Sequence, residues 1–563
     1  MKRQHIFVTN SIFLLFFFCA ISSIKAQVEP GSTAFVAAVD SIFADKADMK
    51  SPGASVIVLK GKDVILSKNY GSANLTFEVP FSEHTIFPLS NLTDQLVAFS
   101  ILQLAKKKAL KLTDPVNKYL PEFGFHNEIS LAHLLNHSSG LPMIASVRLM
   151  AGWNFPDPIY HDDFLSLTKA FAPDLKPNAD IRHDHAGLKI LQMVVEKVSE
   201  MNFSEYASTH IFQPLGMTSS FVKNGHFNET QNNAIGYEEA DGIFERAQAT
   251  VFEMACPITY STQSDFEKWM LNFQTKKFEG DIIEKMDESL SLKGEPQKRE
   301  NRAYCMGQHQ YFRFLGEDEF YLLDVHDGYS WKWVRLKQSD VSIMVIGNVG
   351  SYIGSKVNAI AGLLVSPAAN SDAAEEPAPT PIKMSEKELK AYTGSYWDTG
   401  YLFATEVSIR DGGLYYTDLD NGWHFPLTPL SKSMFGEPSG NLIEITDLNG
   451  KPKLTLTLNS GMKFYSDKYD AAISEKMDRS RYTGVYHSDK LNAFFQLVIE
   501  DNKLILKRSR KPDLELIPID KNKFRTAEID FRLIEFQEDA GQVISQMTIS
   551  NTIVKNIEFQ RLR

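Results

Sequence analysis

The chain is poor in positive charge and in long apolar segments. Its 59 basic residues are outnumbered by 70 acidic ones, which gives a formal net charge of −11 over 563 residues. Because a protein that binds phosphates needs a basic surface, this balance argues against nucleic acid as a partner. Beyond residue 26 no segment is apolar enough to cross a bilayer, so we expect a mature chain without a membrane span.

The first 26 residues have the three parts of a secretory signal peptide. Lys2 and Arg3 precede an apolar run over residues 12–21, and the small residue Ala26 stands at the expected cleavage site. The apolar run is too short to anchor the chain across about 30 Å of hydrocarbon. We therefore predict cleavage and export to the periplasm or the extracellular space. Cleavage removes three basic residues and no acidic ones, which shifts the formal net charge from −11 to −14.

Cysteine is also scarce, with three in the whole chain. Cys19 lies in the signal peptide and follows Phe17 and Phe18, whereas a lipoprotein signal carries small residues there, so no lipid anchor is expected. Cys256 and Cys305 remain after cleavage, and an exported compartment permits a disulfide between them. Two buried free thiols fit the sequence equally well.

The C-terminal part of the chain contains an internal repeat. The sequence Tyr-Thr-Gly-x-Tyr occurs at residues 392–396 and again at residues 482–486, and short alternating strands follow each copy. Two antiparallel, lipocalin-like β-barrels over residues 384–474 and 475–563 are the simplest account, because barrel closure hides strand edges. A single larger β-domain is the alternative. Residues 366–383, rich in Pro, Ala and acidic residues, cannot build a core and are expected to be an exposed linker.

The residues before this linker have the patterns of a packed α/β domain. With 43% hydrophobic and 11% aromatic residues the chain can bury large cores, and its length suggests about three or four domains. A helical pattern over residues 32–47 leads into strand-like runs at residues 54–59 and 64–67. The stretch over residues 85–116 then reads as a short turn and a helix with apolar residues on most sides, which predicts a helix packed on several faces.

That stretch resembles the serine β-lactamase and penicillin-binding-protein-like family, which includes class C β-lactamases, D-aminopeptidases and esterases. In this family the window reads aromatic, x, apolar, small, Ser, x, x, Lys, then the helix, then Leu-x-x-Asp-Pro-Val. Further family phrases occur at residues 70–74, 134–142, 211–217 and 260–265. The residues that match the window without a gap are Phe87, Leu89, Ser90, Leu92, Thr93, Leu110, Leu112, Asp114, Pro115 and Val116.

The resemblance covers residues 27–365 and implies an α/β (α+β) β-lactamase-like transpeptidase fold, in which helices flank an antiparallel sheet. In such a domain the segment around His137 is architectural, so we expect a structural role for this histidine. The chemical residues of the family, in contrast, are replaced. Asn91 stands at the position of the nucleophilic Ser, and Asp94 stands at the position of the Lys.

These two replacements close the family's acyl-enzyme route. In the Ser-x-x-Lys pair, one helical turn places the Lys amine beside the hydroxyl, where it takes or relays the proton of a weak nucleophile. An amide nitrogen is no nucleophile at neutral pH, and the carboxylate of Asp94 carries the opposite charge to the ammonium that it replaces. The resemblance therefore implies no covalent catalysis at Asn91.

The other two motifs of the family are altered as well. His183 and His185 occupy the Tyr and Asn positions of the Tyr-x-Asn motif, and the Lys/His-x-Gly motif of the edge strand is His326-Asp327-Gly328. Aromatic residues at positions 329–333 bring bulk to the same neighbourhood. Because the flanking sequences match the family, the resemblance implies one pocket that contains Asn91, Asp94, His183, His185 and His326.

The first interpretation of this altered site is a catalytically inactive pseudoenzyme whose cleft binds a small peptide, a cell-wall-derived ligand or a protein partner. A second is a repurposed hydrolase of peptide, ester or cell-wall-derived substrates, with Ser90 as nucleophile and Asp94 and His183 as an acid–base pair. One position along a helix turns a side chain by about 100°, so Ser90 is expected to point away from the old reaction centre. The oligomeric state stays open.

Metal binding is the third interpretation. Asp94, His183, His185 and His326 offer a carboxylate and imidazoles to a zinc-like ion. Two histidines that are two positions apart reach one ion only from an extended segment or loop, which is what this position usually is in the resembled family. No other cofactor is implied, and histidines that arose by chance at an inactive site are the simpler account.

Overall fold

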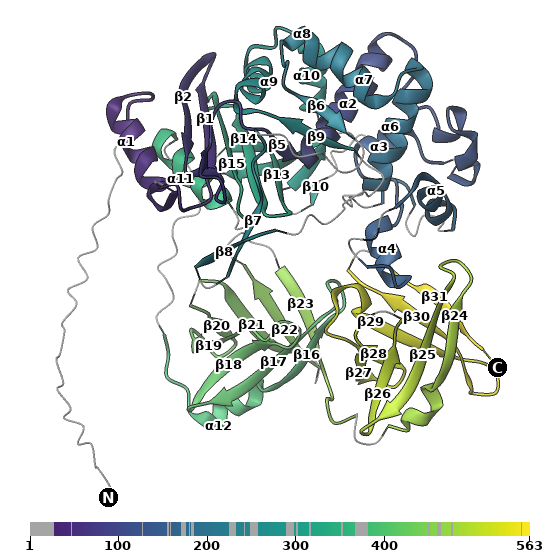
Figure 1. Cartoon of the computed structure of the whole chain (residues 1–563). Coiled ribbons are helices and arrows are strands. Elements are labelled where there is room, and N and C mark those ends of the chain that lie inside the picture. Colours follow the sequence, from purple (N-terminus) through teal and green to yellow (C-terminus); the bar gives the residue numbers. More distant parts are fainter. Residues whose placement is uncertain are drawn as a thin grey trace, which may run out of the picture.

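The computed structural model describes most of the chain from Val28 to Leu562. The predicted signal peptide, nearly all of the predicted linker, His183 and Cys256 lie outside the described residues. Figure 1 shows an N-terminal domain of helices and strands above two β-barrels. Between Val28 and Leu562 the residues that are not described are 47, 127, 155–156, 158, 171–175, 180, 182–184, 224–231, 241, 248–256, 289–297, 300–301, 315–316, 351–352, 366–380, 439, 449–450, 459–462, 474–476, 510 and 553.

An antiparallel sheet of eight strands is the centre of the N-terminal domain, with the order β10-β11-β12-β13-β14-β15-β1-β2. The first and last strands of the domain lie side by side, because β1 pairs with β15. The strands are β1 (Ala54–Lys60), β2 (Asp63–Tyr70), β10 (Lys298–Arg299), β11 (Arg302–Cys305), β12 (Gln308–Phe314), β13 (Glu317–His326), β14 (Tyr329–Leu336) and β15 (Val341–Gly347).

Helices cover both faces of this sheet (Figure 1), which is the arrangement that the sequence predicts. Three small sheets of two or three strands join the helices to it: β3 (Ser72–Asn74) with β4 (Val79–Pro80), β5 (Phe87–Leu89) with β9 (Ile258–Ser261) and β6 (Phe221–Lys223), and β7 (Tyr237–Ala240) with β8 (Ile243–Arg246). The α-helices in the described part of this domain are α1 (Thr33–Ile42), α2 (Ser90–Lys106), α3 (Leu131–Leu135), α4 (Ile144–Met150), α5 (His161–Ala170), α6 (His185–Ser199), α7 (Phe203–Ala207), α8 (Gln213–Leu215), α9 (Gln263–Thr275), α10 (Gly280–Met286) and α11 (Gly354–Leu364).

The central strand β1 is apolar on both faces because each face has its own hydrophobic cluster. Successive side chains along a strand point to opposite faces. Val56 and Val58 accordingly pack in the cluster that contains α1 and α11, whereas Ile57 and Leu59 pack in the cluster that contains α2 and α9. The continuous apolar run in the sequence is therefore that of a strand buried between two layers of helices.

The residues after the linker form two closed barrels of eight antiparallel strands each. Two barrels, and not one larger β-domain, are confirmed. A short helix, α12 (Glu386–Leu389), precedes the first barrel. The first barrel is β16 (Gly394–Asp398), β17 (Phe403–Arg410), β18 (Gly413–Asp418), β19 (His424–Pro429), β20 (Met434–Gly436), β21 (Leu442–Leu448), β22 (Lys451–Thr457) and β23 (Lys463–Tyr469). The second barrel is β24 (Gly484–Ser488), β25 (Ala493–Glu500), β26 (Lys503–Lys507), β27 (Leu514–Asp520), β28 (Lys523–Arg525), β29 (Leu533–Glu538), β30 (Ile544–Ser550) and β31 (Ile557–Arg561).

The repeated Tyr-Thr-Gly-x-Tyr sequence opens both barrels in the same way. The hydroxyl of Tyr396 donates to the carbonyl of Tyr392 at 2.9 Å, and the hydroxyl of Tyr486 donates to the carbonyl of Tyr482 at 2.8 Å. The glycine between them has a φ of +148° in the first barrel and +142° in the second. A Cβ at either glycine would lie within 3.0 Å of a basic side chain from the last strand. The repeat is therefore the element at which each barrel closes.

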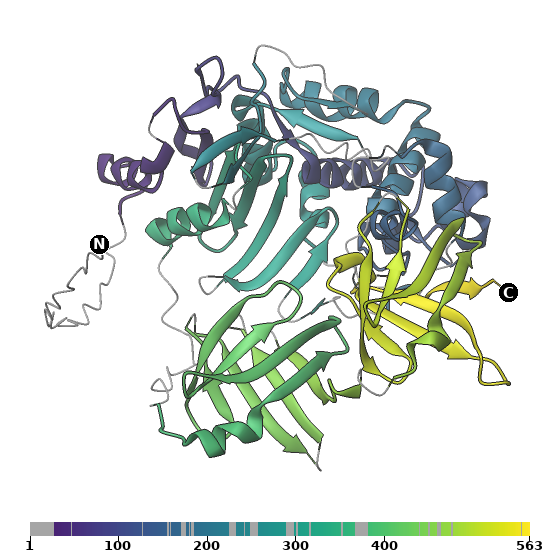
Figure 2. The same cartoon turned by 60° about the horizontal axis from the view of Figure 1, so that its bottom comes forward.

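The second barrel packs against the N-terminal domain. Figures 1 and 2 both place it beside the helical part of that domain, and Figure 1 shows α4 at the junction. Val147 of α4 and Phe531 of the barrel belong to one continuous hydrophobic cluster. Lys511 of the barrel also donates to the backbone carbonyl of Leu149 at 3.3 Å. The second barrel and α4 are therefore parts of the same core.

Cys305 is a buried free thiol. Its sulfur donates to Oε1 of Gln310 at 3.3 Å, and burial raises the pKa of the thiol to about 12. Of the two alternatives for the cysteines, the structure thus has the free thiol at this position, while Cys256 lies outside the described residues.

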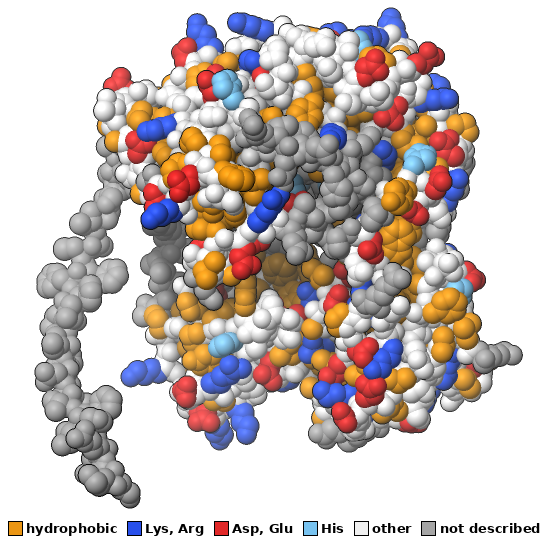
Figure 3. Space-filling view, viewed as in Figure 1, with side chains coloured by type: hydrophobic (Ala, Val, Ile, Leu, Met, Phe, Trp, Pro, Cys, Tyr) orange, Lys and Arg blue, Asp and Glu red, His pale blue; other side chains and the backbone are white. Residues whose placement is uncertain are grey.

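Charged side chains of both signs are intermixed over the face of the molecule in Figure 3. The same view is hollowed between the N-terminal domain and the barrels, and hydrophobic side chains are visible in the recess. Among the helices that the structure describes, none is both long and apolar enough to cross a membrane.

Candidate functional site

The start of helix α2 forms the floor of the site. Strand β5 pairs with β9, and the chain passes from β5 directly into α2. The hydroxyls of Thr93 and Thr259 are hydrogen-bonded at 2.7 Å, and the indole of Trp269 donates to Gln95 at 2.8 Å. All four side chains are buried. Because buried polar groups that are fully paired hold one geometry, the first turns of α2 are rigid.

Ser90 and Asn91, the first residues of α2, both reach strand β13. The amide of Asn91 donates to the backbone carbonyl of Leu323 at 2.6 Å, and the hydroxyl of Ser90 donates to the carboxylate of Asp324. The prediction that Ser90 points away from the site is wrong. Ser90 directly follows an extended strand, so no preceding helical turn directs its side chain. The residue at the family's nucleophile position, Asn91, thus has its side-chain amide hydrogen-bonded to the sheet.

His326 is placed by a two-residue hairpin turn. Asp327 and Gly328 have φ values of +49° and +75°, and His326 pairs with Tyr329 across the turn. Two positive φ values are those of a type I′ turn, which favours Asp-Gly. Gly328 is required for a second reason, because a Cβ there would lie 2.4 Å from the backbone nitrogen of Tyr237. The His-Asp-Gly sequence is therefore the end of β13 and the turn that follows it.

The imidazole of His326 lies beside the carboxylate that Ser90 contacts. Nδ1 of His326 is 3.0 Å from Oδ2 of Asp324, which is an ion-pair distance without the alignment of a hydrogen bond. Burial lowers the pKa of His326, but Asp324 and Asp327 outweigh it, so the pKa is raised above its ordinary value. The carboxylate thus lies between hydroxyl and imidazole. In a Ser-His-Asp triad, by contrast, the imidazole contacts the hydroxyl.

Asp94 is buried one helical turn after Ser90, with 6% of its surface exposed. The turn between β11 and β12 packs closely on the helix here. Gly307 has a φ of +86°, and a Cβ on it would lie 2.9 Å from the carbonyl oxygen of Asp94. Burial raises the pKa of the neighbouring Tyr304 well above its ordinary value, and the charge of Asp94 adds to this rise. Asp94 therefore stands on a fixed backbone beside a phenol.

His185 is the first residue of helix α6. The expectation that this position lies on an extended segment is wrong, because the helix extends back to His185. In the part of the chain that the structure describes, no group of three or more His, Cys, Asp or Glu side chains is arranged to hold a metal ion. The described members of the predicted metal set, Asp94, His185 and His326, therefore form no such group, and the fourth, His183, lies outside the described residues.

One cleft brings together four of the five predicted positions, namely Asn91, Asp94, His185 and His326. Its empty space is about 630 Å³, part of it open to solvent. The chemical role of these residues stays a prediction, as does the position of His183. The described residues that line the cleft are Ser90, Asn91, Thr93, Asp94, His185, Pro257, Ile258, Asp324, Val325 and His326.

The aromatic residues after the His-Asp-Gly turn do not fill this cleft. Trp331 and Trp333 are buried on β14, with 1% and 2% of their surfaces exposed. Both pack edge-on against Phe266 of α9, at ring-centroid distances of 6.2 and 5.4 Å. Since residues two apart on a strand share a face, both indoles belong to the core between sheet and helix.

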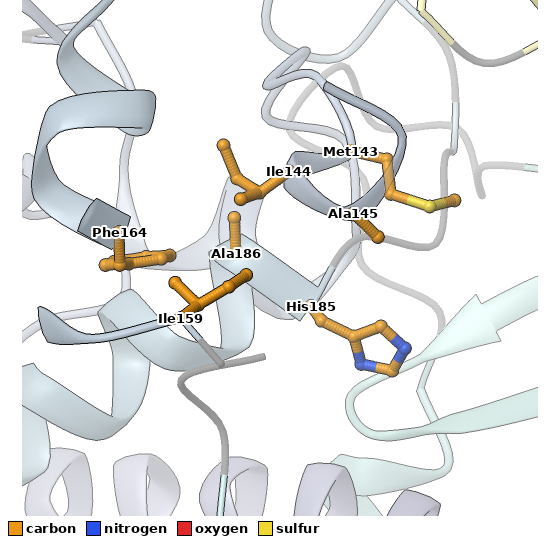
Figure 4. Close-up of a pocket in the computed structure, with 7 residues that line it drawn as sticks. All are labelled: Met143, Ile144, Ala145, Ile159, Phe164, His185 and Ala186. Atoms are coloured by element: carbon orange, nitrogen blue, oxygen red, sulfur yellow. The ribbon is translucent and has the colours of Figure 1, made fainter. Parts of the chain in front are cut away.

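A small apolar pocket adjoins the cleft at His185, which lines both spaces. Its empty space is about 240 Å³, including its mouth. Figure 4 shows the side chains of Ile144, Ile159, Phe164 and Ala186 gathered around it, whereas the imidazole of His185 points away from them. His185 therefore stands between a polar and an apolar space.

Among the described titratable residues that line the cleft, Asp324 is the one that was not predicted. It stands two positions before His326 on β13, so the alternation of a strand places both side chains on one face. The two-residue alternation along the strand could therefore have identified Asp324 from the sequence. Pro257 and Ile258, which also line the cleft, carried no comparable signal because neither residue type suggests chemistry.

The segment around His137 is packed scaffold. His137 is buried and lies edge-on to Tyr304, with ring centroids 4.1 Å apart. Its φ of +51° is rare for a residue with a side chain. The carbonyl of Ser138 accepts a hydrogen bond from the backbone of Asn178 at 2.7 Å. None of these residues lines the cleft.

Comparisons with known proteins point to one family. The sequence model described as β-lactamase matches residues 39–353. The chain is 26% identical over 188 residues to penicillin-binding protein 4* of Bacillus subtilis (strain 168). The aligned region covers 33% of this chain and 41% of that protein. It is 24% identical over 316 residues to protein flp of Staphylococcus aureus (strain MRSA252). The aligned region covers 53% of this chain and 60% of that protein. The chain thus spans less than two thirds of the length of these relatives.

Solved structures show the same fold. The octameric penicillin-binding protein homologue from Pyrococcus abyssi has a TM-score of 0.50 and 22% identity, covering 85% of this chain and 98% of that one. A crystal structure of SurE has a TM-score of 0.50 and 16% identity, covering 77% of this chain and 98% of that one. At such identities the likeness concerns the fold alone.

Proposed function

This chain belongs to the β-lactamase family, and from that premise we propose that it is an exported pseudoenzyme that binds a ligand without forming an acyl-enzyme. The binding site is the cleft between α2 and β13. Because the cleft is partly open to solvent, an extended ligand can lie in it without being enclosed, and we propose a small peptide, a cell-wall-derived fragment or a short segment of a protein partner as its occupant. The ligand is held by the polar groups of the floor and the wall.

The observation that carries this proposal is the hydrogen bond between Asn91 and Leu323. The side-chain amide at the nucleophile position is 2.6 Å from a backbone carbonyl of β13, so it is an anchor between helix and sheet. No Lys or Arg is among the described residues that line the cleft. The described lining therefore offers neither the hydroxyl at the family's position nor an amine to activate it.

One contact favours a second candidate, a hydrolase that uses Ser90. This serine lines the cleft and donates to Asp324, whose carboxylate is a possible acceptor for its proton. The arrangement of Ser90, Asp324 and His326 argues against hydrolysis with Ser90 as the nucleophile. His326 contacts the carboxylate and not the hydroxyl, so it is not placed to take the serine proton and pass it to a leaving group. We therefore favour ligand binding over hydrolysis as the function of this cleft.

Intact-mass measurement separates the two candidates. The mature protein is incubated with benzylpenicillin and, separately, with a fluorophosphonate probe, and we expect no adduct with either. Ser90→Ala is the matched control, because it removes the alternative nucleophile and leaves Asn91 in place. A stoichiometric adduct on wild type that disappears in Ser90→Ala would replace the proposal by the hydrolase.

Ligand binding is tested with a mixture of soluble cell-wall fragments and short peptides in equilibrium dialysis. We expect the wild-type protein to retain a subset of these compounds. His326→Trp, which adds bulk at the cleft wall, should lose them. Equal retention by both proteins would place the binding site elsewhere.

The exported part of the proposal rests on residues 1–26. We expect protein recovered from outside the cytoplasm to begin at Gln27 when its N-terminus is sequenced. Lys2→Glu with Arg3→Glu, which reverses the charge of the first part of the signal, should keep more of the protein in the cell. Recovery of uncleaved protein from the cytoplasm alone would contradict export.

A further inference from the structure

We propose that the apolar pocket beside His185 is a subsite for a methyl- to ethyl-sized substituent of the ligand, and that the second barrel sets the width of this subsite through α4. The inference rests on the proposed function, because it assigns a subsite to the ligand of the same cleft. It also gives the second barrel a role in ligand selection.

The lining of the pocket defines the chemistry of its occupant. The described lining includes Met143 and Ala145 at the start of α4 and residues of α5 and α6, and His185 is the one described lining side chain that is not apolar. A wall of this kind stabilises an apolar group and gives a polar one no partner. The enclosed part of this space is little larger than a water molecule. It therefore takes a small substituent and not a whole ligand.

The pocket and the cleft share a lining side chain. His185 lines both spaces. Figure 4 shows its imidazole turned away from Ile159 and Phe164, so the ring does not occupy the apolar space. A ligand held by polar groups of the cleft can therefore extend an apolar group beside His185 into the pocket.

The wall formed by α4 depends on the second barrel. This helix has seven residues, too few to be stable without tertiary contacts. Val147 is fully buried in the cluster that includes Phe531, from the 3-10 helix Ile529–Phe531 of the barrel. Lys511 donates to the carbonyl of Leu149 near the end of α4 at 3.3 Å. The side of α4 that faces the barrel is thus held while its first turn lines the pocket.

The packing at this interface couples the barrel to α4. Val147 and Phe531 are both fully buried in one cluster. A movement of the barrel relative to α4 would expose this apolar surface unless α4 moved with it, so the movement is transmitted to the pocket wall.

Xenon is a suitable probe because it enters apolar cavities without any polar contact. The full mature chain is labelled at methionine methyl groups with carbon-13 and followed by NMR under xenon pressure. We expect a saturable shift of the Met143 methyl signal, while Met344 in the central sheet stays unchanged. Ala145→Leu fills the pocket from α4 and should abolish the response. Absence of a response at Met143 in wild type would overturn the subsite.

Lys511→Met tests the part played by the barrel. We expect the half-saturating xenon pressure at Met143 to change by about threefold or more, because a charged hydrogen bond to α4 is lost. Lys503→Met is the matched control, since Lys503 forms an exposed ion pair with Glu515 on the same barrel, and it should leave the pressure unchanged. Equal effects of the two substitutions would overturn the coupling.

Phe531→Leu provides a second test of the interface should Lys511→Met fail to fold, because Phe531 shares a hydrophobic cluster with Val147 of α4, and it should change the xenon response at Met143 as well. A wild-type response in Phe531→Leu would contradict the proposal. The outcome is independent of the acylation test. An adduct on Ser90 would refute the pseudoenzyme and leave the xenon response at Met143 as evidence for the subsite.

Discussion

The two barrels open with the same motif and have the same strand order, yet they are attached differently. The first barrel has a hydrophobic cluster of its own, which includes Tyr396. The interior of the second barrel, with Tyr486, belongs to the cluster that also contains the helices of the N-terminal domain. A repeated sequence therefore specifies a repeated fold, while the outer surface of each copy decides what it packs against.

The first barrel is joined to the second by charge and by a small apolar contact. Asp420 forms ion pairs with Arg525 and Arg532 of the second barrel, and all three side chains are largely buried. Trp397 and Ile519 meet in a separate cluster between the barrels. The apolar pocket beside His185 is thus linked to the second barrel through α4.

The largest expected effect comes from truncating the second tyrosine of each repeat. Tyr396→Ala and Tyr486→Ala each remove a fully buried ring, which costs about 3–5 kcal/mol of unfolding free energy. We expect Tyr486→Ala to increase amide hydrogen exchange in α4 and in the second barrel, because they share one core. Tyr396→Ala should increase it in the first barrel alone. Identical exchange patterns in the two variants would contradict the difference between the barrels.

Asp420→Ala should separate the barrels without disturbing the cleft. Removing the carboxylate leaves two buried guanidinium groups unpaired, which costs about 3 kcal/mol. We expect faster hydrogen exchange at the contact between the barrels and an unchanged cleft. Asp467→Ala is the control, because its ion pair with Lys453 is exposed, and its effect should stay within about 0.5 kcal/mol. A changed ligand affinity in Asp420→Ala would show that the first barrel also reaches the cleft.

His326 should make the stability of the N-terminal domain depend on pH. Its pKa is raised in the folded protein, so the folded state holds the proton more tightly than the unfolded state, whose pKa is about 6.5. The resulting stabilisation is complete below that value and is lost as pH rises through the folded-state pKa. We expect the difference in unfolding free energy between wild type and His326→Asn to fall over this window. A difference that grows with pH would contradict the pairing with Asp324.

The smallest expected effect is the sharpest test of the repeat itself. Tyr396→Phe and Tyr486→Phe each remove one hydroxyl that donates to a backbone carbonyl at 2.9 and 2.8 Å. Each loss costs about 1 kcal/mol, and the two values should agree because the geometry is the same. Denaturation of each variant measures them. Values that differ by more than about 1 kcal/mol would show that the two motifs are not equivalent.

Much of the fold was predictable because the signals are local. Alternating strands, the Tyr-Thr-Gly-x-Tyr repeat and the helix after Leu89 follow from residues that are neighbours in the sequence. The family frame likewise placed Asn91, Asp94, His185 and His326 at one cleft. The direction of Ser90 was not predictable in the same way, since it depends on the approach of a strand more than two hundred positions away.

The sequence by itself excludes the Ser-Lys chemistry of the family at these positions. An amide at Asn91 and a carboxylate at Asp94 cannot act as a Ser-Lys pair in any fold, because the identity of these groups excludes it. Only the tertiary structure decided what the altered residues contact. The amide of Asn91 is hydrogen-bonded to β13, Asp324 comes between Ser90 and His326, and α4 lies between the apolar pocket beside His185 and the second barrel. These contacts join residues that are far apart in the sequence, so they follow from packing and from no local pattern.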